Sequence, residues 1–193
     1  MKPRDFQHDY WKNPARENIP GAYLSTHRWE RSKFLASLCR DAGILPEHTI
    51  LEIGCNVGRN LKVLWDSGYK RLSGIEINKA AVDLMREKFP EMDIPVRVGS
   101  IENYIRFVDN ADVIISVTVL MHIHPDSEWI MGEMVQKARR WIITIEDECN
   151  HNSERILSRN YKDIFEGLGM RCIRTEREVP GMSAVYTARV FEK

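Results

Sequence analysis

The sequence predicts one α/β domain, built on a seven-stranded, mostly parallel sheet with helices on both faces. Two observations predict this fold class. Apolar runs of strand length alternate with helical patterns through most of the 193-residue chain, as they do in consecutive βα units. The last two apolar runs, at 171–179 and 183–193, have no helix between them, so they form an antiparallel hairpin at the end of the sheet.

The first 43 residues are expected to form an ordered helical arm or lid on this single domain, which spans residues 1–193. Tyr10, Trp11 and Tyr23 make the segment richer in aromatic side chains than a disordered tail. Residues 29–42 have apolar side chains at helical spacing, and Gly43 suits the end of a helix. The alternative is a helix that simply packs on the sheet.

Five βα units follow the arm. The expected strands are 49–53, 71–77, 95–99, 112–117 and 140–146. The expected helices are 57–65, 79–89, 101–107, 126–138 and 159–168. Asn78 is placed to begin the second of these helices, and Pro90 ends it; Asp126 or Ser127 is expected to begin the fourth.

Composition restricts the partners of the chain. Lys+Arg and Asp+Glu each number 28, so the zero formal charge gives no sign of a nucleic-acid partner. No apolar run is long enough to cross a membrane, and the N-terminus lacks the apolar core of a signal peptide. The four cysteines form no CxxC pair. These features predict a cytoplasmic protein with reduced thiols and set no oligomeric state.

The segment ILEIGCNVGRNL, residues 50–61, has the pattern of a strand that leads through a glycine loop into a helix. Gly54 and Gly58 allow a ligand to approach the backbone. The middle glycine of a dinucleotide fingerprint is replaced by Asn56, and the Walker pattern is absent. Glu76 ends the second expected strand, where a carboxylate can bind ribose hydroxyls. The pattern predicts an adenosine-type ligand without a pyrophosphate.

The motifs LEIGCNVGRN, GIEIN, VGSIEN and ADVIISVTVLMHI together resemble the class I S-adenosylmethionine-dependent methyltransferases. The resemblance covers residues 49–146. It implies S-adenosylmethionine as cofactor and, with strands numbered in chain order, the strand order 3-2-1-4-5-7-6 with strand 7 antiparallel. It implies these cofactor-binding residues: Glu52, Gly54, Cys55, Asn56 and Gly58 at the methionine end, Glu76 at the ribose, Ile77, Ser100 and Ile101 at the adenine, and Ser116 and Val117 at the sulfonium and amino group.

For the apolar members of this set, the alternative is plain sheet core. Arg31, in the arm, is a further candidate, since an arginine there could pair with the cofactor's carboxylate.

Methyl transfer from a sulfonium is an in-line displacement, so positioning of the reactants supplies most of the acceleration. A base is needed only when the acceptor must lose a proton. His122 and Glu146 are the candidates for that role. For His122, the alternative is a histidine that only packs the loop.

The acidic run at 146–148 has two further interpretations. It could bind a cationic or polyhydroxylated acceptor, or hold a divalent metal as in catechol-type methyltransferases, but other carboxylate ligands are not evident. We therefore expect no metal. A solvated acidic loop is the remaining alternative. The expected acceptor-binding residues are Tyr10, Tyr23, His124 and Glu148.

The sequence favours a small-molecule acceptor. Residues 116–119 read SVTV, where nucleic-acid N-methyltransferases of this fold carry a D/N/S-P-P-Y/F/W motif and cytosine C5 enzymes a Pro-Cys pair. A faint similarity to methylases of nonulosonic-acid biosynthesis favours a sugar-like metabolite. The sequence does not distinguish methylation of an oxygen atom from methylation of a nitrogen atom. The alternatives are a protein or peptide methyltransferase, and a non-catalytic cofactor-binding or NAD-type protein.

Overall fold

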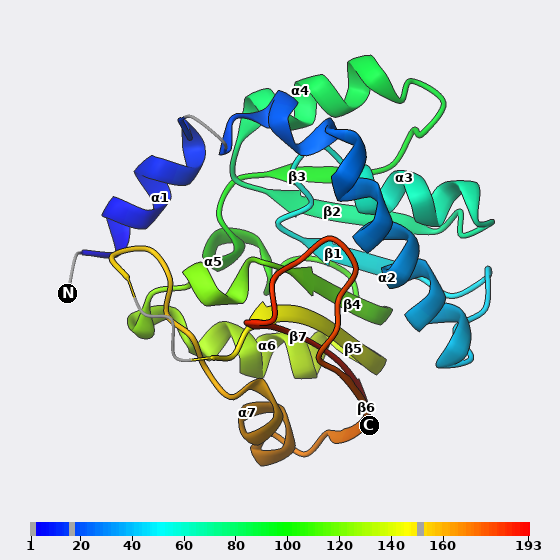
Figure 1. Cartoon of the computed structure of the whole chain (residues 1–193), viewed down its shortest axis with the longest axis vertical. Coiled ribbons are helices and arrows are strands. Elements are labelled where there is room, and N and C mark those ends of the chain that lie inside the picture. The colour runs from blue at the N-terminus through cyan, green and yellow to red at the C-terminus, as the bar shows by residue number, and fades with distance from the viewer. Residues whose placement is uncertain (1–2, 16–17, 150–152) are drawn as a thin grey trace.

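The computed structural model describes residues 3–15, 18–149 and 153–193. Its centre is one seven-stranded sheet in the order β3-β2-β1-β4-β5-β7-β6 (Figure 1). The strands are β1 Ile50–Ile53, β2 Leu72–Glu76, β3 Val96–Val98, β4 Ala111–Val117, β5 Ala138–Asp147, β6 Arg171–Glu176 and β7 Tyr186–Glu192. The predicted strand order is confirmed.

Strand direction also agrees with the prediction. β7 runs antiparallel to both β5 and β6, and every other neighbouring pair is parallel. Ile53 at the end of β1 lies opposite Ile75 in β2 and Ser116 in β4. The loops that leave these three strands therefore emerge side by side at one edge of the sheet, where open α/β folds bind their ligands.

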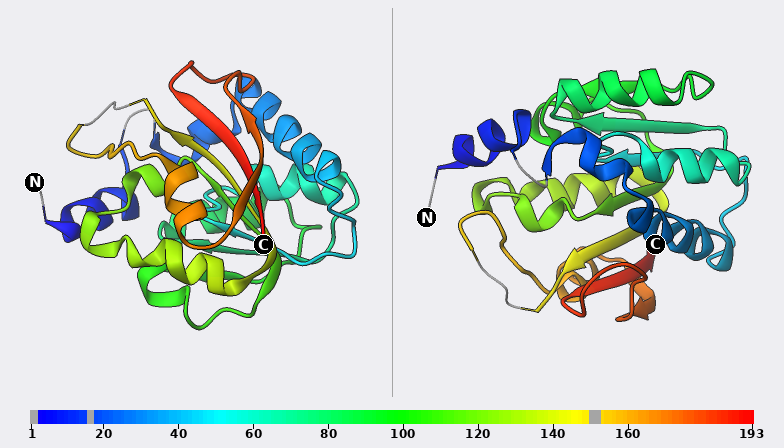
Figure 2. Two further views of the ribbon diagram at one scale, coloured as in Figure 1. Left: turned by 90° about the horizontal axis from the view of Figure 1, so that it is seen from below. Right: turned by 45° about the horizontal axis from the view of Figure 1, so that its top comes forward.

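Helices cover both faces of the sheet (Figures 1 and 2). The α-helices are α1 Arg4–Lys12, α2 Trp29–Asp41, α3 Arg59–Asp66, α4 Lys79–Lys88, α5 Ile101–Tyr104, α6 Trp129–Lys137 and α7 Tyr161–Gly167. The short 3-10 helices are η2 Pro20–Leu24, η3 Thr26–Arg28, η4 Leu120–His122 and η5 Pro125–Ser127. Of the predicted arm, residues 1–2 and 16–17 lie outside the described residues.

Two hydrophobic cores lie on opposite faces of the sheet. One core joins α2, α3 and α4 to the sheet and includes Leu38, Leu64, Met85 and Val113. The other core joins α5, α6 and α7 to the opposite face and includes Ile105, Met134, Phe165 and Ile114. Val113 and Ile114 are neighbours in β4 but belong to different cores, because successive side chains of a strand point to opposite faces. A parallel sheet buried on both sides explains the continuous apolar strands of the sequence.

Three helices begin later than predicted, and the first of them, α3, begins at Arg59 rather than at residue 57. The helix expected from residue 126 begins at Trp129, because Pro125 starts a separate 3-10 turn. His124, rather than Asp126 or Ser127, caps that turn: its Nδ1 accepts from the Asp126 N–H at 3.2 Å. The predicted cap was therefore wrong. The helix expected from residue 159 begins at Tyr161, where the Asn160 side chain accepts from the Asp163 N–H.

The loop between β6 and β7, residues 177–185, is longer than predicted. Both strands of the hairpin are shorter than the sequence patterns at 171–179 and 183–193 indicated. Val179 is buried in the core with α2, so the chain leaves the sheet to pack there. Gly181 has a φ of +71°, and a Cβ added to it would lie 3.0 Å from the His27 carbonyl oxygen. The loop therefore lies against the N-terminal arm (Figure 1).

Among the described residues, no helix combines the length and the apolar character needed to cross a bilayer.

Gly58→Ala should destabilise the fold. Gly58 caps α3 with a φ of +68°, and an added Cβ would overlap Met85 of α4. We expect a loss of about 1–3 kcal/mol in the free energy of unfolding, measured by urea titration. The control is Gly132→Ala in α6, where an added Cβ meets no atom within 4 Å and a helical alanine should cost nothing. Equal stability of the two variants would contradict the expectation.

Candidate active site

A cavity of ≈ 120 Å³ lies at the carboxyl ends of β1, β2 and β4, beneath α1. The loops that leave these strands line it, and α1 contributes Gln7, His8 and Trp11 to the lining. Eight of the residues predicted to bind the cofactor line it: Gly54, Cys55, Asn56, Glu76, Ile77, Ser100, Ile101 and Val117. Arg31, from α2, also lines it. Glu52, Gly58 and Ser116 do not line it.

The loop after β1 adopts a backbone conformation that requires a small or polar residue. Gly54 and Asn56 have φ values of +65° and +50°, the left-handed region that glycine and asparagine adopt most readily. An added Cβ at Gly54 would overlap Val119 in the loop after β4. Close packing of these two loops therefore explains Gly54, whereas Gly58 is required by its contact with α4.

Glu76 ties the loop after β1 to the end of β2. Its Oε2 accepts from the Asn56 N–H and its Oε1 from the Asn78 N–H, both at 2.8 Å. Burial raises the pKa of Glu76, although these backbone hydrogen bonds oppose the rise. A carboxylate has about four acceptor positions. The backbone N–H groups do not use all of them, so the carboxylate can still accept a hydrogen bond from a ribose hydroxyl.

A buried polar cluster supports the cavity from behind. Asn60 donates to Glu52 Oε1 at 2.6 Å and accepts from the Ser32 hydroxyl at 2.6 Å. Arg59 donates to Ser32 Oγ at 2.8 Å and to the Tyr23 carbonyl oxygen at 3.0 Å. Burial raises the pKa of Glu52 to about 8 and lowers the pKa of Arg59 to about 9. The cluster joins β1, α2, α3 and the arm into one support.

Three buried polar atoms of cavity-lining residues have no hydrogen-bond partner among the described residues. They are Gln7 Oε1, Trp11 Nε1 and Arg31 Nε. All three belong to the N-terminal arm. Burial, together with the nearby charge of Arg28, lowers the pKa of Arg31. Unsatisfied buried polar groups are costly, so a polar ligand that reached these atoms would stabilise the arm in this position.

Helix α1 is fastened to the rim of the cavity at three points. His8 Nε2 lies 3.0 Å from Glu102 Oε1, Gln7 donates to the Glu154 carbonyl oxygen at 3.1 Å, and the Trp11 ring lies 4.5 Å from the His122 ring. Burial raises the pKa of Glu102, but the hydrogen bond and charge of His8, together with hydrogen bonds from the Glu102 backbone and Ser127, outweigh it and lower that pKa to about 2. These contacts hold α1 over the cavity.

A second, larger cavity of ≈ 460 Å³ adjoins the first. Its walls come from the arm, the loop after β4, residues 153–156 and the loop between β6 and β7. The two cavities share five lining residues: Trp11, Tyr23, Arg31, Thr118 and His122. The cavities therefore meet along this shared wall.

Thr118 and His122 form the part of the shared wall that comes from the loop after β4. Thr118 has a φ of +56°, which is unusual for a β-branched residue and marks strain of the kind found at functional sites. His122 Nδ1 lies 2.5 Å from the Arg155 carbonyl oxygen. A carbonyl only accepts, so Nδ1 carries the proton and Nε2 keeps its lone pair. Burial lowers the pKa of His122 to about 4, so the ring is neutral near pH 7.

Glu146 does not line either cavity. Its carboxylate is fully buried and accepts hydrogen bonds from the Ser116 hydroxyl at 2.7 Å and from the N–H groups of Val119, Leu120 and Met121 at 3.1–3.2 Å. Burial raises the pKa of Glu146 to about 7, despite these hydrogen bonds. In this structure Glu146 fixes the loop after β4. Its carboxylate does not face either cavity, so the geometry gives no support to its predicted role as a base.

The other carboxylates of the predicted acidic rim also face away from the cavities. Asp147 accepts from the Ser158 hydroxyl and the Cys149 N–H. Glu148 forms an ion pair with Arg189 at 2.6 Å. Among the described residues, no group of three or more potential ligands could hold a metal ion. Of the residues predicted to bind the acceptor, Tyr10 and Tyr23 line the larger cavity, and His124 lines the smaller one.

Sequence patterns missed several lining residues. Thr118 follows Val117 directly, so the end of the strand could have indicated it. Arg155 and Tyr186 come from segments without a motif, and only the fold brings them to the larger cavity. His8 and Gln7 belong to α1, whose position over the sheet has no signal in the local sequence.

The buried Glu52 should make stability depend on pH. Its folded pKa of about 8 exceeds the ordinary 4.5, so between these values the folded state holds a proton that the unfolded state has lost. The free energy of unfolding should therefore fall as pH rises through this window. Glu52→Gln, which cannot ionise, should flatten the fall between pH 7 and 8 in urea titrations. Glu47→Gln, at an exposed site, should keep the wild-type slope; an unchanged slope in both variants would refute this.

The site and the fold can now be compared with known proteins. Residues 51–140 match the family model of the methyltransferase domain. No curated protein sequence matches the chain. A structure of magnesium protoporphyrin IX methyltransferase from Synechocystis PCC 6803, solved with bound S-adenosylmethionine, is 16% identical; the match covers 100% of this chain and 96% of that one, with a TM-score of 0.73.

Two further structures have the same fold. A putative RNA methyltransferase from Pyrococcus horikoshii is 15% identical, with 100% of this chain and 97% of that chain covered and a TM-score of 0.68. A putative sarcosine dimethylglycine methyltransferase from Galdieria sulphuraria is 12% identical, with 83% and 84% covered and a TM-score of 0.71. The domain match over residues 51–140, together with the strand order, supports a class I S-adenosylmethionine-dependent methyltransferase.

Proposed function

We propose that this enzyme transfers the methyl group of S-adenosylmethionine to an oxygen or nitrogen atom of a small-molecule acceptor. One observation carries the proposal: the cavity beside Glu76 and the larger cavity meet along a wall that contains Thr118 and His122. A cofactor in the first cavity and an acceptor in the second would therefore be in contact at that wall. Such placement of two reactants is the main requirement of an in-line displacement.

The residues of the smaller cavity fit the cofactor. Glu76 would hold the ribose hydroxyls with its remaining acceptor positions, and Ile77 and Ile101 would contact the adenine. Arg31, whose Nε has no partner among the described residues, would bind the carboxylate of the methionine part. Bound there, the cofactor supplies a methyl group made electrophilic by its sulfonium.

His122 is proposed to orient the acceptor. Because its Nδ1–H donates to the Arg155 carbonyl oxygen, Nε2 can accept a hydrogen bond from the acceptor's hydroxyl or amine. This hydrogen bond would fix the direction of the acceptor's attacking lone pair. Nε2 would then receive the acceptor's proton as the bond to the methyl carbon forms. The low pKa of His122 keeps the ring unprotonated, and thus able to accept, throughout the neutral range.

The arm at residues 1–43 is proposed to act as a lid of the single domain. The smaller cavity has a volume of ≈ 120 Å³, whereas ligand pockets hold roughly 300–1,000 Å³. Helix α1 would therefore move outward to admit the cofactor and return to exclude water from the reaction. The contacts of His8 with Glu102 and of Gln7 with Glu154 are the ones that this movement breaks.

The size of the larger cavity favours a metabolite over a protein or peptide acceptor. A volume of ≈ 460 Å³ lies in the range of small-molecule sites. The structures of similar fold include a magnesium protoporphyrin IX methyltransferase, a putative RNA methyltransferase and a putative sarcosine dimethylglycine methyltransferase, so the fold alone does not select an acceptor. The tyrosines at residues 10 and 23 are consistent with a hydroxylated, sugar-like molecule.

Calorimetry with S-adenosylhomocysteine and with NAD tests the cofactor assignment. Only the first should bind, and Glu76→Gln should weaken its binding at least about tenfold, since one hydrogen bond to a charged group contributes about 1.5–3 kcal/mol. Asp83→Asn, on the exposed face of α4, should bind as the wild type does. Binding of NAD, or full affinity in Glu76→Gln, would contradict the proposal.

His122→Ala should lower kcat by about 100-fold, the lower range for loss of a proton-transfer group. The affinity for S-adenosylhomocysteine should change far less, because the histidine acts on the acceptor. The measurement is transfer of a labelled methyl group to metabolite pools, with His48→Asn as the control, since His48 lines neither cavity. A wild-type rate in His122→Ala would remove His122 from the mechanism.

A further inference from the structure

The larger cavity carries an excess of positive charge. Arg28, Arg31 and Arg155 line it. No aspartate or glutamate lines it among the residues that the structure describes. This is the opposite of the acidic acceptor site that the run at 146–148 suggested. From this charge distribution we infer that the methyl acceptor is a small molecule with an anionic group, a carboxylate or a phosphate, that Arg28 and Arg155 bind; the inference rests on the proposed function.

The guanidinium groups of this cavity are available to a ligand. Within the described parts of the chain, none of the three arginines forms an ion pair with a carboxylate. Arg28 instead stacks on the Tyr23 ring at 4.6 Å, and Arg155 stacks on the Tyr10 ring at 4.2 Å. A stacked guanidinium keeps its N–H edge free for the two oxygens of a carboxylate or phosphate. The tyrosine rings therefore hold the guanidinium groups in place without neutralising their positive charge.

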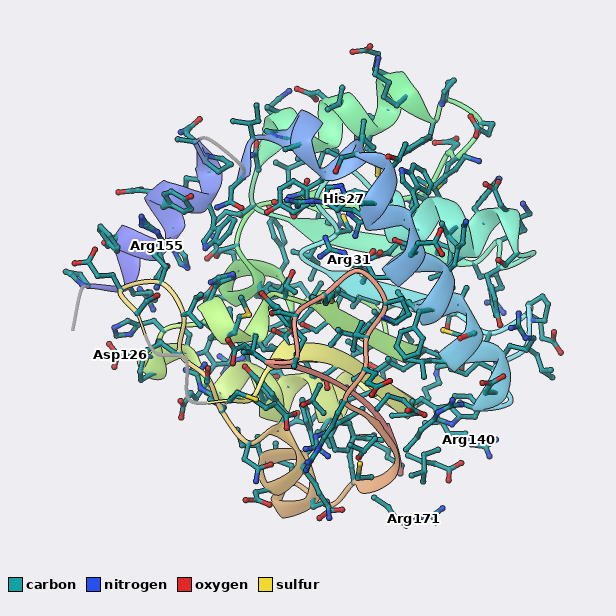
Figure 3. The ribbon with its side chains drawn as sticks, in the orientation of Figure 1. His27, Arg31, Asp126, Arg140, Arg155 and Arg171 are labelled. Atoms are coloured by element: carbon teal, nitrogen blue, oxygen red, sulfur yellow. The ribbon has the colours of Figure 1, made fainter. Side chains whose placement is uncertain are left out.

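The anion expected here is distinct from the carboxylate of the cofactor. Arg31 lines both cavities, so it can serve the cofactor. Arg28, Arg155 and His27 line the larger cavity alone. Figure 3 shows that Arg31 and Arg155 lie apart, Arg31 near the β6–β7 loop and Arg155 beside α1. Arg28 and Arg155 can therefore bind an anion other than the carboxylate of the cofactor.

Repulsion between the arginines also favours an anionic ligand in the larger cavity. The charge of Arg28 contributes to the lowered pKa of Arg31, so the ligand-free cavity holds like charges at some cost. A bound anion would relieve this cost, whereas a cationic acceptor would increase it. The larger cavity would therefore select its acceptor by charge. An unpaired or repelled charge in a partly buried site costs more binding free energy than a lost contact does.

Three ligands with one carbon chain test the inference: sorbitol, gluconate and sorbitol 6-phosphate, titrated into protein saturated with S-adenosylhomocysteine. At least one of the two anions should bind at least tenfold more tightly than sorbitol. Arg28→Met and Arg155→Met should each remove most of that preference, and the lysine variants should keep part of it. Arg86→Met, on exposed α4, should keep all of it. Comparison of the two anions distinguishes a carboxylate site from a phosphate site.

Equal binding of sorbitol and both anions, or loss of the preference in Arg86→Met, would overturn the inference. A second measurement uses labelled cofactor and a deproteinised cell extract separated by anion exchange. Label in the retained, anionic fraction supports the inference, and label confined to the unretained fraction overturns it. Label that enters only macromolecules would indicate a nucleic-acid or protein acceptor and would also overturn it. Failure of S-adenosylhomocysteine to bind would instead refute the proposed function.

Discussion

The buried carboxylate of Glu146 is the constraint on which the geometry of the site depends. It lies at the end of β5 and collects the Ser116 hydroxyl and three consecutive backbone N–H groups from the loop after β4. Without such an acceptor, these buried donors would be unsatisfied. The loop so fixed carries Thr118 and His122 to the wall between the two cavities, and Val119 to its contact with Gly54. A residue that faces neither ligand thus determines where both ligands meet.

The two cavities are built by different means. The smaller cavity uses the edge where parallel strands end, and Glu76 binds the adjacent loops together there. The larger cavity uses segments beyond this edge: the arm, residues 153–156 and the β6–β7 loop. Charge separates them further, since the first has the buried carboxylate of Glu76 and the second has only basic and neutral side chains among its described lining. The cofactor assignment therefore follows from the fold, and the acceptor assignment from side-chain chemistry.

The cofactor-binding residues could be predicted from the sequence because they lie close together along the chain. Gly54 and Asn56 lie in one loop, and Glu76 ends the next strand, so motif and periodicity place them without knowledge of packing. The acceptor side was not accessible in this way. Arg155 and Tyr186 approach Arg28 only through the antiparallel return of β7 and the course of the segment before α7.

The acidic run shows the limit of sequence reasoning most clearly. Three consecutive charged residues suggested an exposed rim, but β5 is longer than predicted and includes Asp147, and Glu148 pairs with Arg189. Whether a carboxylate is a ligand or an internal acceptor depends on which donors the fold supplies. For Glu146 and Glu148 those donors come from β4, the loop after β4 and β7, all distant in the chain.

The origin of the larger cavity's walls bears on how such enzymes diverge. Because Tyr10, Arg28 and Arg155 line the larger cavity and supply no side chain to the two cores, substitutions at such positions disturb the scaffold little. A duplicated copy could acquire a new substrate through changes in three short stretches, with little loss of folding stability to select against. Acceptor choice can thus change through few substitutions, while the catalytic frame stays constant.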